Sequence, residues 1–234
     1  TADPFEVDDP ATVARLVCRA LDSCSAARQK ALEQAIVQNR RKGKRFVFLE
    51  RQVSPADAER VRALQLPGLT IYPESKRYYP NRQIGTNFLG YVGLDNEGLA
   101  GLEAKYDSRV RGRDGRVMLT TDGMQNAMAV REELPPTWGD SLELTIDKYL
   151  QYIAERELAA GVDEHNAEGG MAIVMDPRNG EILALANYPT FNPNAFERAD
   201  GADRANRAVQ HVYEPGSTFK LVTAAAALEE GVFQ

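Results

Sequence analysis

Two apolar runs flank a turn sequence in residues 170–188, which read GMAIVMDPRNGEILALANY. The runs, 171–175 and 181–186, each have the length and composition of a strand, and Asp-Pro-Arg-Asn-Gly lies between them. A helical pattern over residues 147–160 precedes them, and another over residues 217–230 follows. A helix that follows an antiparallel hairpin can pack on it, so the sequence predicts an α+β fold in which an antiparallel sheet packs with helices.

The helical pattern ahead of the hairpin has an apolar stripe and a glycine at its expected end. The stripe consists of Leu150, Ile153, Ala154 and Leu158. Gly161 is expected to end the helix. Alternation of Leu142, Leu144 and Ile146 predicts a strand just before it. Residues 134–140, Leu-Pro-Pro-Thr-Trp-Gly-Asp, form a stiff joint ahead of that strand, so we expect a domain boundary there.

The part of the chain before this joint combines helices with short extended segments. Helical spacing covers residues 11–39, and a serine cap followed by proline predicts a short helix from Ser54. Strands are expected at residues 46–49 and 69–72. Residues 77–123 are rich in Gly, Tyr and Asn, which indicates short elements and turns.

Cys18 and Cys24 are the only cysteines, and both fall within the helical pattern. Six residues of unbroken helix would separate them by about 9 Å along the axis, which exceeds the reach of a disulfide. A break near residues 22–23 would permit a bridge. The sequence therefore leaves both the bridged and the free state open.

The 234 residues contain 43% hydrophobic and 26% charged side chains, an ordinary globular composition without a membrane-spanning apolar run. The net charge of −6 argues against nucleic acid as a partner, because phosphate contacts need clustered cations. Five cations do cluster at residues 40–45, where they form either a solvated helix end or a contact for anionic lipid or a partner. Only two histidines, His165 and His211, and no Gly-rich phosphate loop occur, so no metal or cofactor is expected.

Residues 213–220, Tyr-Glu-Pro-Gly-Ser-Thr-Phe-Lys, place a serine at a helix start and a lysine one turn later. Helical geometry puts Lys220 about 60° from Ser217 around the axis, within hydrogen-bonding reach. A serine becomes a good nucleophile only when a base removes its proton. Burial and the positive end of the helix dipole both disfavour an ammonium, so Lys220 could act as a neutral base. The N–H of Ser217 could form half of an oxyanion hole.

The same spacing also fits a structural role, because Ser-x-x-Lys is expected about once by chance in a chain of this length. In that role Ser217 would be a helix cap and Lys220 an exposed side chain. The neighbouring residues favour the catalytic interpretation, since a Pro-Gly loop precedes the serine and an apolar stripe follows it. We expect this stripe to bury the helix on the sheet; it consists of Leu221, Ala224, Ala225 and Leu228.

Further sequence blocks accompany this motif. In the N-terminal part they are RYYP at 77–80, LGYVG at 89–93, GLAGLE at 98–103, YD at 106–107 and GRDG at 112–115. In the C-terminal part they are TID at 145–147, LQ at 150–151, DP at 176–177, GEILA at 180–184, Pro189, and NRA at 206–208. Together with residues 213–220, these blocks resemble the class B penicillin-binding proteins, serine transpeptidases that cross-link peptidoglycan. The resemblance implies an elongated, non-catalytic pedestal domain of the dimerisation or interaction type over residues 1–135, and an incomplete N-terminal portion of the transpeptidase domain over residues 136–234.

The resemblance also implies roles for particular residues. Ser217 is the implied nucleophile, acylated by a peptidoglycan stem peptide with release of D-alanine and also by β-lactams, and Lys220 is the implied general base. The implied partners are a membrane glycosyltransferase and cell-division proteins. The implied location is the inner membrane, through a single-pass anchor, with the catalytic part in the periplasm. Glu214 before Pro-Gly-Ser favours the septal branch of the family. We interpret four acidic residues as structural: Glu103, Asp107, Asp147 and Asp176.

The chain departs from the family pattern because it contains no anchor segment, no Ser-x-Asn and no Lys-Thr-Gly or Lys-Ser-Gly. We therefore expect an excised piece of a longer protein, inactive alone because its second and third catalytic motifs lie elsewhere. Two other functions stay open. One is a β-lactam sensor or hydrolase relative, although the pedestal-like region argues against a hydrolase. The other is a non-catalytic cell-wall scaffold.

Overall fold

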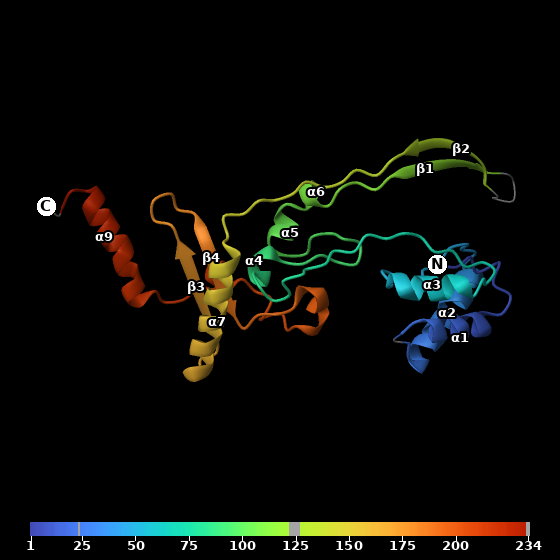
Figure 1. Ribbon diagram of the computed structural model, residues 1–234, viewed down its shortest axis with the longest axis horizontal. Helices are drawn as coiled ribbons and strands as arrows, with labels where there is room; N and C mark the ends of the chain where they lie inside the picture. Colours follow the sequence, from blue (N-terminus) through green and yellow to red (C-terminus); the bar gives the residue numbers. More distant parts are fainter. Residues whose placement is uncertain (23, 122–126, 233–234) are drawn as a thin grey trace. The chain divides into compact units, whose positions relative to one another are not determined.

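The computed structural model describes residues 1–22, 24–121 and 127–232. The chain forms two compact units, Thr1–Arg77 and Tyr78–Gln234 (Figure 1). Helices and antiparallel strand pairs are both present, which confirms the predicted α+β class. The predicted boundary between residues 135 and 136 concerns domains rather than compact units, and it stays a prediction.

The described residues of the first unit form helices α1 (Pro10–Ala20), α2 (Ala26–Arg41) and α3 (Pro55–Ala63). Each begins at a side-chain cap, supplied by Asp9, Ser25 and Ser54 respectively. Their apolar faces meet in one core, in which Ile36 and Leu32 of α2 are almost fully buried. Further members of this core are Ala2, Val7, Val13, Ala14, Val17, Val47 and Leu49.

The helical pattern over residues 11–39 is divided between α1 and α2. Helix α1 ends at Ala20, Leu21 is extended, and Ser25 caps the next helix. This break brings the Cα atoms of Cys18 and Cys24 to 5.2 Å, and the two cysteines form a disulfide. Of the two states that the sequence left open, the structure has the bridged one.

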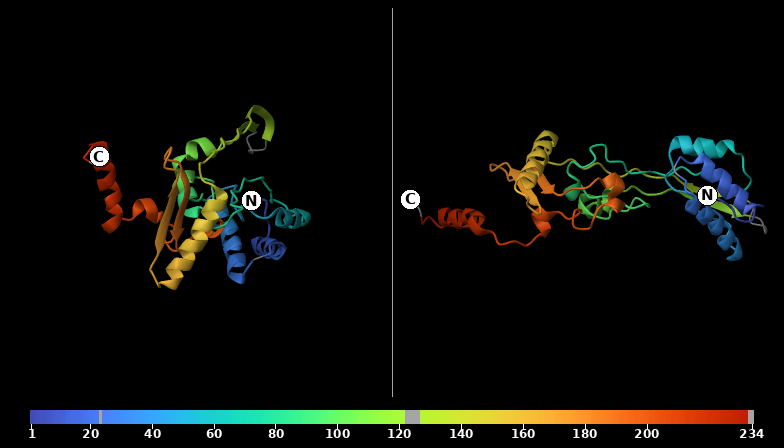
Figure 2. Two further views of the ribbon diagram at one scale, coloured as in Figure 1. Left: turned by 60° about the vertical axis from the view of Figure 1, so that its left-hand side comes forward. Right: turned by 90° about the horizontal axis from the view of Figure 1, so that it is seen from below.

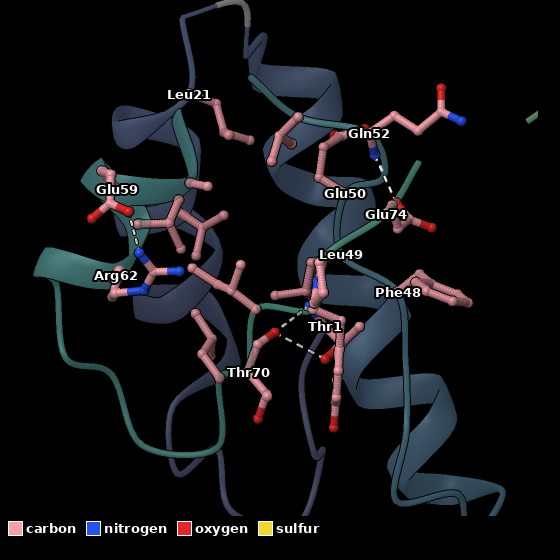
Figure 3. A pocket seen from close by; sticks show the side chains of 18 of the residues that line it. Thr1, Leu21, Phe48, Leu49, Glu50, Gln52, Glu59, Arg62, Thr70 and Glu74 are labelled. Carbon is pink, nitrogen blue, oxygen red and sulfur yellow. Dashed lines mark hydrogen bonds and ion pairs between the residues drawn. The ribbon is translucent and has the colours of Figure 1, made fainter. Parts of the chain in front are cut away.

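The strands predicted at 46–49 and 69–72 are wrong as regular strands. Both segments are extended, but each pairs with Ala2 through a single isolated bridge, at Val47 and at Leu69. Alternation still determines which residues are buried, because Val47 and Leu49 enter the core. A pocket of about 390 Å³ lies beside these segments, lined mainly by apolar side chains, with the Glu59–Arg62 ion pair at its margin (Figure 3).

The second unit is organised around a helix and a hairpin. Helix α7 (Lys148–Glu164) packs on the antiparallel pair β3 (Gly170–Met175) and β4 (Ile182–Tyr188), as Figure 2 shows from two directions. Gly170 lies opposite Tyr188 in the register. The predicted hairpin is thus confirmed. The predicted helix end at Gly161 is wrong, because α7 continues for three residues beyond this glycine to Glu164.

The strand predicted from Leu142, Leu144 and Ile146 is also wrong, since no ladder includes this segment. The segment nevertheless reaches β4. The Thr145 hydroxyl donates to the Ile182 carbonyl at 2.7 Å, and the Asp147 N–H donates to the Leu183 carbonyl at 2.8 Å. A strand needs a partner along its length, and here only its last residues have one.

Within the range 77–123, for which short elements and turns were predicted, residues 78–115 contain α4 (Thr86–Leu89), α5 (Gly101–Lys105) and α6 (Asp107–Val110). They pack closely, because a Cβ atom on Gly90 would lie 1.9 Å from the Ala100 carbonyl oxygen. A second antiparallel hairpin, β1 (Arg116–Thr121) and β2 (Ala127–Leu134), was not predicted. The remaining elements are η1 (Pro193–Arg198), α8 (Arg207–Gln210), η2 (Gly216–Phe219) and α9 (Lys220–Glu229). None of the helices in the described ranges combines the length and apolar character that a membrane crossing needs.

Candidate active site

Ser217 lies in the short 3₁₀ turn η2, which leads directly into α9. Gly216 precedes it with φ +52°, a left-handed conformation that glycine adopts without strain. The Thr218 N–H donates to the Pro215 carbonyl at 3.1 Å and closes the turn. The predicted helix start is therefore present, with Lys220 as the first α-helical residue.

The Ser217 and Lys220 side chains are both exposed. Across the described residues, no hydrogen bond involves the Ser217 hydroxyl or the Lys220 ammonium. The expected burial of Lys220 is wrong for this structure, because the helix that carries it is not covered. Leu221 and Leu228 of the expected stripe are 77% and 69% exposed. The roles of Ser217 and Lys220 stay predictions.

The segment that leads to this serine is anchored by buried asparagines. Asn187, at the end of β4, donates to the Asn206 side-chain oxygen at 3.2 Å and accepts from the Ala208 N–H at 3.1 Å. Asn87 donates to the carbonyls of Asp203 and Ala205 at 2.8 and 3.0 Å. These bonds fix the chain up to the start of α8, and residues 209–220, from the second half of α8 onward, are exposed.

The four acidic residues interpreted as structural have structural contacts. Asp147 caps α7 by accepting from the N–H groups of Tyr149 and Leu150. Asp176 accepts hydrogen bonds from the Arg178 guanidinium and from the Arg178 backbone N–H in the β3–β4 turn, and these bonds lower the pKa of its carboxyl. Asp107 accepts the Gly98 N–H at 2.7 Å, and buried Glu103 accepts from the Tyr79 hydroxyl at 3.2 Å.

Two polar residues of α7, Gln151 and Glu155, make buried or partly buried hydrogen bonds that the sequence analysis did not predict. Gln151 is 1% exposed, and its side-chain amide bonds both the N–H and the carbonyl of Leu185, at 2.7 and 2.9 Å. It also donates to Glu155 at 2.7 Å, and Glu155 accepts the Gly85 N–H at 2.7 Å. Burial raises the pKa of Glu155. The sequence feature that could have indicated this role is the spacing of Gln151 and Glu155, two polar residues four apart on the side of the helix that faces the sheet.

Among the described residues, no group of three or more His, Cys, Asp or Glu side chains could hold a metal ion. The arrangement at η2 and α9 instead offers a hydroxyl, an amine one turn on, and backbone N–H groups at a helix start. These are the components of serine acyl transfer, provided that the amine is brought to the hydroxyl.

Two family models match the chain. The Penicillin-binding Protein dimerisation domain matches residues 2–144, more than half of the chain, and the Penicillin binding protein transpeptidase domain matches residues 170–234. Peptidoglycan D,D-transpeptidase FtsI of Buchnera aphidicola is 34% identical over 196 residues, which cover 84% of this chain and 34% of the relative. Stage V sporulation protein D of Bacillus subtilis is 39% identical over 183 residues, 77% of this chain and 28% of the relative.

The crystal structure of a peptidoglycan synthetase from Bifidobacterium adolescentis aligns with a TM-score of 0.61 at 28% identity, covering 96% of this chain and 40% of that one. The chain belongs to the class B penicillin-binding proteins, which confirms the resemblance noted from its sequence blocks. It spans about a third of the length of the curated relatives it matches.

Proposed function

We propose that this chain contributes the nucleophilic serine of a peptidoglycan D,D-transpeptidase. The observation that carries the proposal is the position of Ser217, at the start of a helix with Lys220 one turn later, inside the region that matches the transpeptidase domain model. The Ser217 oxygen attacks the carbonyl carbon of the stem-peptide D-alanyl-D-alanine bond. The C–N bond breaks, the terminal D-alanine leaves with a proton, and an ester to Ser217 forms. An amine of a second stem peptide then attacks this ester and restores the serine.

Lys220 is proposed as the base in the first step. In the described structure the amine is exposed, so its activation requires cover over α9. Covering the apolar residues of α9 would remove water from the amine, and the N-terminal end of the helix would further disfavour the ammonium. Both effects disfavour the ammonium and favour the neutral amine that can accept the Ser217 proton.

A β-lactam would acylate Ser217 by opening of its ring, which gives a direct test. The 234 residues contain no Ser-x-Asn and no Lys-Thr-Gly, so we expect the chain alone not to react efficiently with fluorescent penicillin. A longer chain that supplies both motifs should be labelled stoichiometrically. Ser217→Ala should abolish this label without loss of fold, and Thr223→Ala, at an exposed position of α9, serves as the control. Efficient labelling of the 234 residues alone would contradict the expected inactivity, and labelling of the Ser217→Ala variant would contradict the assigned nucleophile.

Two measurements distinguish a transpeptidase from the two alternative functions: the rate at which the acyl group is released, and the effect of Ser217→Ala in cells. A β-lactam hydrolase would release the acyl group quickly, whereas a transpeptidase retains it. A scaffold would tolerate Ser217→Ala in cells, whereas a transpeptidase would lose cross-linking.

The name FtsI among the relatives, together with Glu214 before Pro-Gly-Ser, supports a septal role with a membrane glycosyltransferase and cell-division proteins as partners. A membrane anchor and a periplasmic catalytic part complete the proposal.

A further inference from the structure

Residues 46–48 form the edge of a small extended ribbon in the first unit. Val47 donates its N–H to the Ala2 carbonyl at 3.0 Å and accepts the Ala2 N–H at 2.9 Å. On the other side of residues 1–3, the Asp3 N–H donates to the Gly68 carbonyl at 2.8 Å. The ribbon therefore has three segments, with residues 1–3 in the middle and residues 46–48 along one edge.

The outer side of this edge has unused backbone groups. Neighbouring residues in an extended segment direct their N–H and C=O groups to opposite sides, so those of Phe46 and Phe48 point away from Ala2. Within the described ranges, no hydrogen bond engages the backbone of Phe46 or Phe48. The edge ends on both sides of them, because the Lys44 N–H bonds the Asn39 carbonyl and the Leu49 carbonyl accepts from Arg28. Two donors and two acceptors are thus available to a further strand.

Two phenylalanine rings stand beside these groups. Phe46 and Phe48 are each 48% exposed, and their ring centroids lie 4.9 Å apart in an edge-to-face arrangement. The alternate residues Val47 and Leu49 are buried in the core. The Arg51 guanidinium lies over the Phe48 ring, 4.7 Å from its centroid. An exposed apolar surface therefore borders the free edge.

The basic cluster at residues 40–45 is only partly used within the unit. Arg40 donates to the carbonyls of Pro4 and Val7, and Arg45 pairs with Asp3 at 2.9 Å. The other three cations are exposed and have no ion pair among the described residues: Arg41, Lys42 and Lys44. These three cations precede Phe46 by two to five residues in the sequence, and their positive charge favours a negatively charged partner.

We propose that residues 46–48 bind an extended, acidic polypeptide segment of another protein, which adds to the ribbon as a strand. Its backbone pairs with Phe46 and Phe48, alternate apolar side chains cover the two rings, and its carboxylates face Arg41, Lys42 and Lys44. Anionic lipid would suit the cations and the rings, but it offers no row of N–H donors for the two free carbonyls. An acidic polypeptide can pair with the free backbone groups, cover the two rings and face the cations.

A library of seven-residue peptides, selected for binding to the 234-residue chain, tests the proposal. We expect the selected peptides to alternate Asp or Glu with apolar residues and to exclude proline. Methylation of alternate backbone nitrogens in the best peptide should weaken its Kd at least tenfold. Amide hydrogen exchange gives a residue-level readout. Binding should slow exchange at Phe46 and Phe48, whereas Val47, already bonded to Ala2, serves as the internal control.

Matched variants separate the side-chain contributions. Phe46→Ser with Phe48→Ser should remove binding, and Lys42→Glu with Lys44→Glu should weaken it at least tenfold. Tyr149→Ser, at an exposed position of α7 in the second unit, and Lys30→Glu, at an exposed position of α2, should leave it unchanged. The proposal is overturned if no peptide is selected, if N-methylation has no effect, or if Phe46 and Phe48 exchange equally fast in the complex. Binding only to phosphatidylglycerol vesicles, or edge-to-edge self-association of the chain, would overturn it equally.

Discussion

At the scale of single residues, the Gln151 side chain makes the hydrogen bonds to β4 that a neighbouring strand would otherwise make. Its side-chain amide satisfies both backbone groups of Leu185, a buried position on β4. A backbone group buried without a partner has a large desolvation cost. The side chain of a helix residue thus completes the hydrogen bonding of the sheet, and it also contacts Glu155.

Gln151→Leu should therefore destabilise the second unit by about 2–4 kcal/mol, because it leaves two buried backbone groups unpaired. Thermal and urea unfolding would measure the loss. Gln83→Leu makes the same chemical change at an exposed position and should alter stability by less than about 0.5 kcal/mol. Equal stability of Gln151→Leu and the parent chain would show that Leu185 finds other partners.

Glu155 gives a pH-dependent prediction. Burial raises the folded-state pKa above the ordinary value of 4.5, although hydrogen bonds from Gly85 and Gln151 oppose the shift. The folded state then holds the proton more tightly than the unfolded state. The stability from this group is fully present below the unfolded pKa and is lost as the pH rises through the folded pKa.

Glu155→Gln keeps an acceptor oxygen for both hydrogen bonds and removes the ionisation. We expect the variant to match the parent chain at about pH 4 and to exceed its melting temperature at about pH 7. Glu157→Gln, an exposed carboxyl on the same helix, is the control. A melting-temperature difference that does not change with pH would exclude this role for Glu155.

At the scale of elements, local signals explain which predictions succeeded. The β3–β4 hairpin followed from two apolar runs and the Asp-Pro-Arg-Asn-Gly turn between them, and these residues need only each other to form it. The strand at Leu142–Ile146 needed a partner along its whole length. Its periodicity could not show that the described hydrogen bonds to β4 come from Thr145 and Asp147, at the end of the segment. Likewise, the apolar stripe of α9 was visible in the sequence, but what covers it was not.

The disulfide between Cys18 of α1 and Cys24, which precedes α2, is an element-scale constraint that the sequence left open. Closing a loop of this size removes unfolded-chain entropy worth about 2 kcal/mol at room temperature. Cys18→Ser with Cys24→Ser should therefore lower the melting temperature of the first unit by roughly 10 °C. Calorimetry of the parent chain and the variant would measure this shift. Reductant should reproduce it in the parent chain and have no effect on the variant.

At the scale of the whole molecule, the chain consists of two compact units, each with its own packing. Their cores are built differently: the first surrounds Leu32 and Ile36, and the second joins α7 to β4. The candidate nucleophile belongs to the second unit and the proposed binding edge to the first. The residue-level connections within each unit, such as Gln151 to Leu185, could not be derived from patterns, because they join positions far apart in sequence.

Separate cores predict separate unfolding transitions. Ile36→Ala removes fully buried volume from the first unit. It should lower the free energy of unfolding of that unit by about 2–5 kcal/mol and leave the transition of the second unit unchanged. Gln151→Leu should affect only the second. Differential scanning calorimetry would resolve the two, and a single transition that moves with both variants would show that the units unfold together.

The close approach at Gly90 restricts how this sequence can diverge. Its φ of +84° and the 1.9 Å between a hypothetical Cβ and the Ala100 oxygen leave no room for even a methyl group. A saturation library at codon 90 should return glycine alone. Descendants of this sequence could therefore vary the loops around Gly90, but we expect them to keep glycine at this crossing of two backbones.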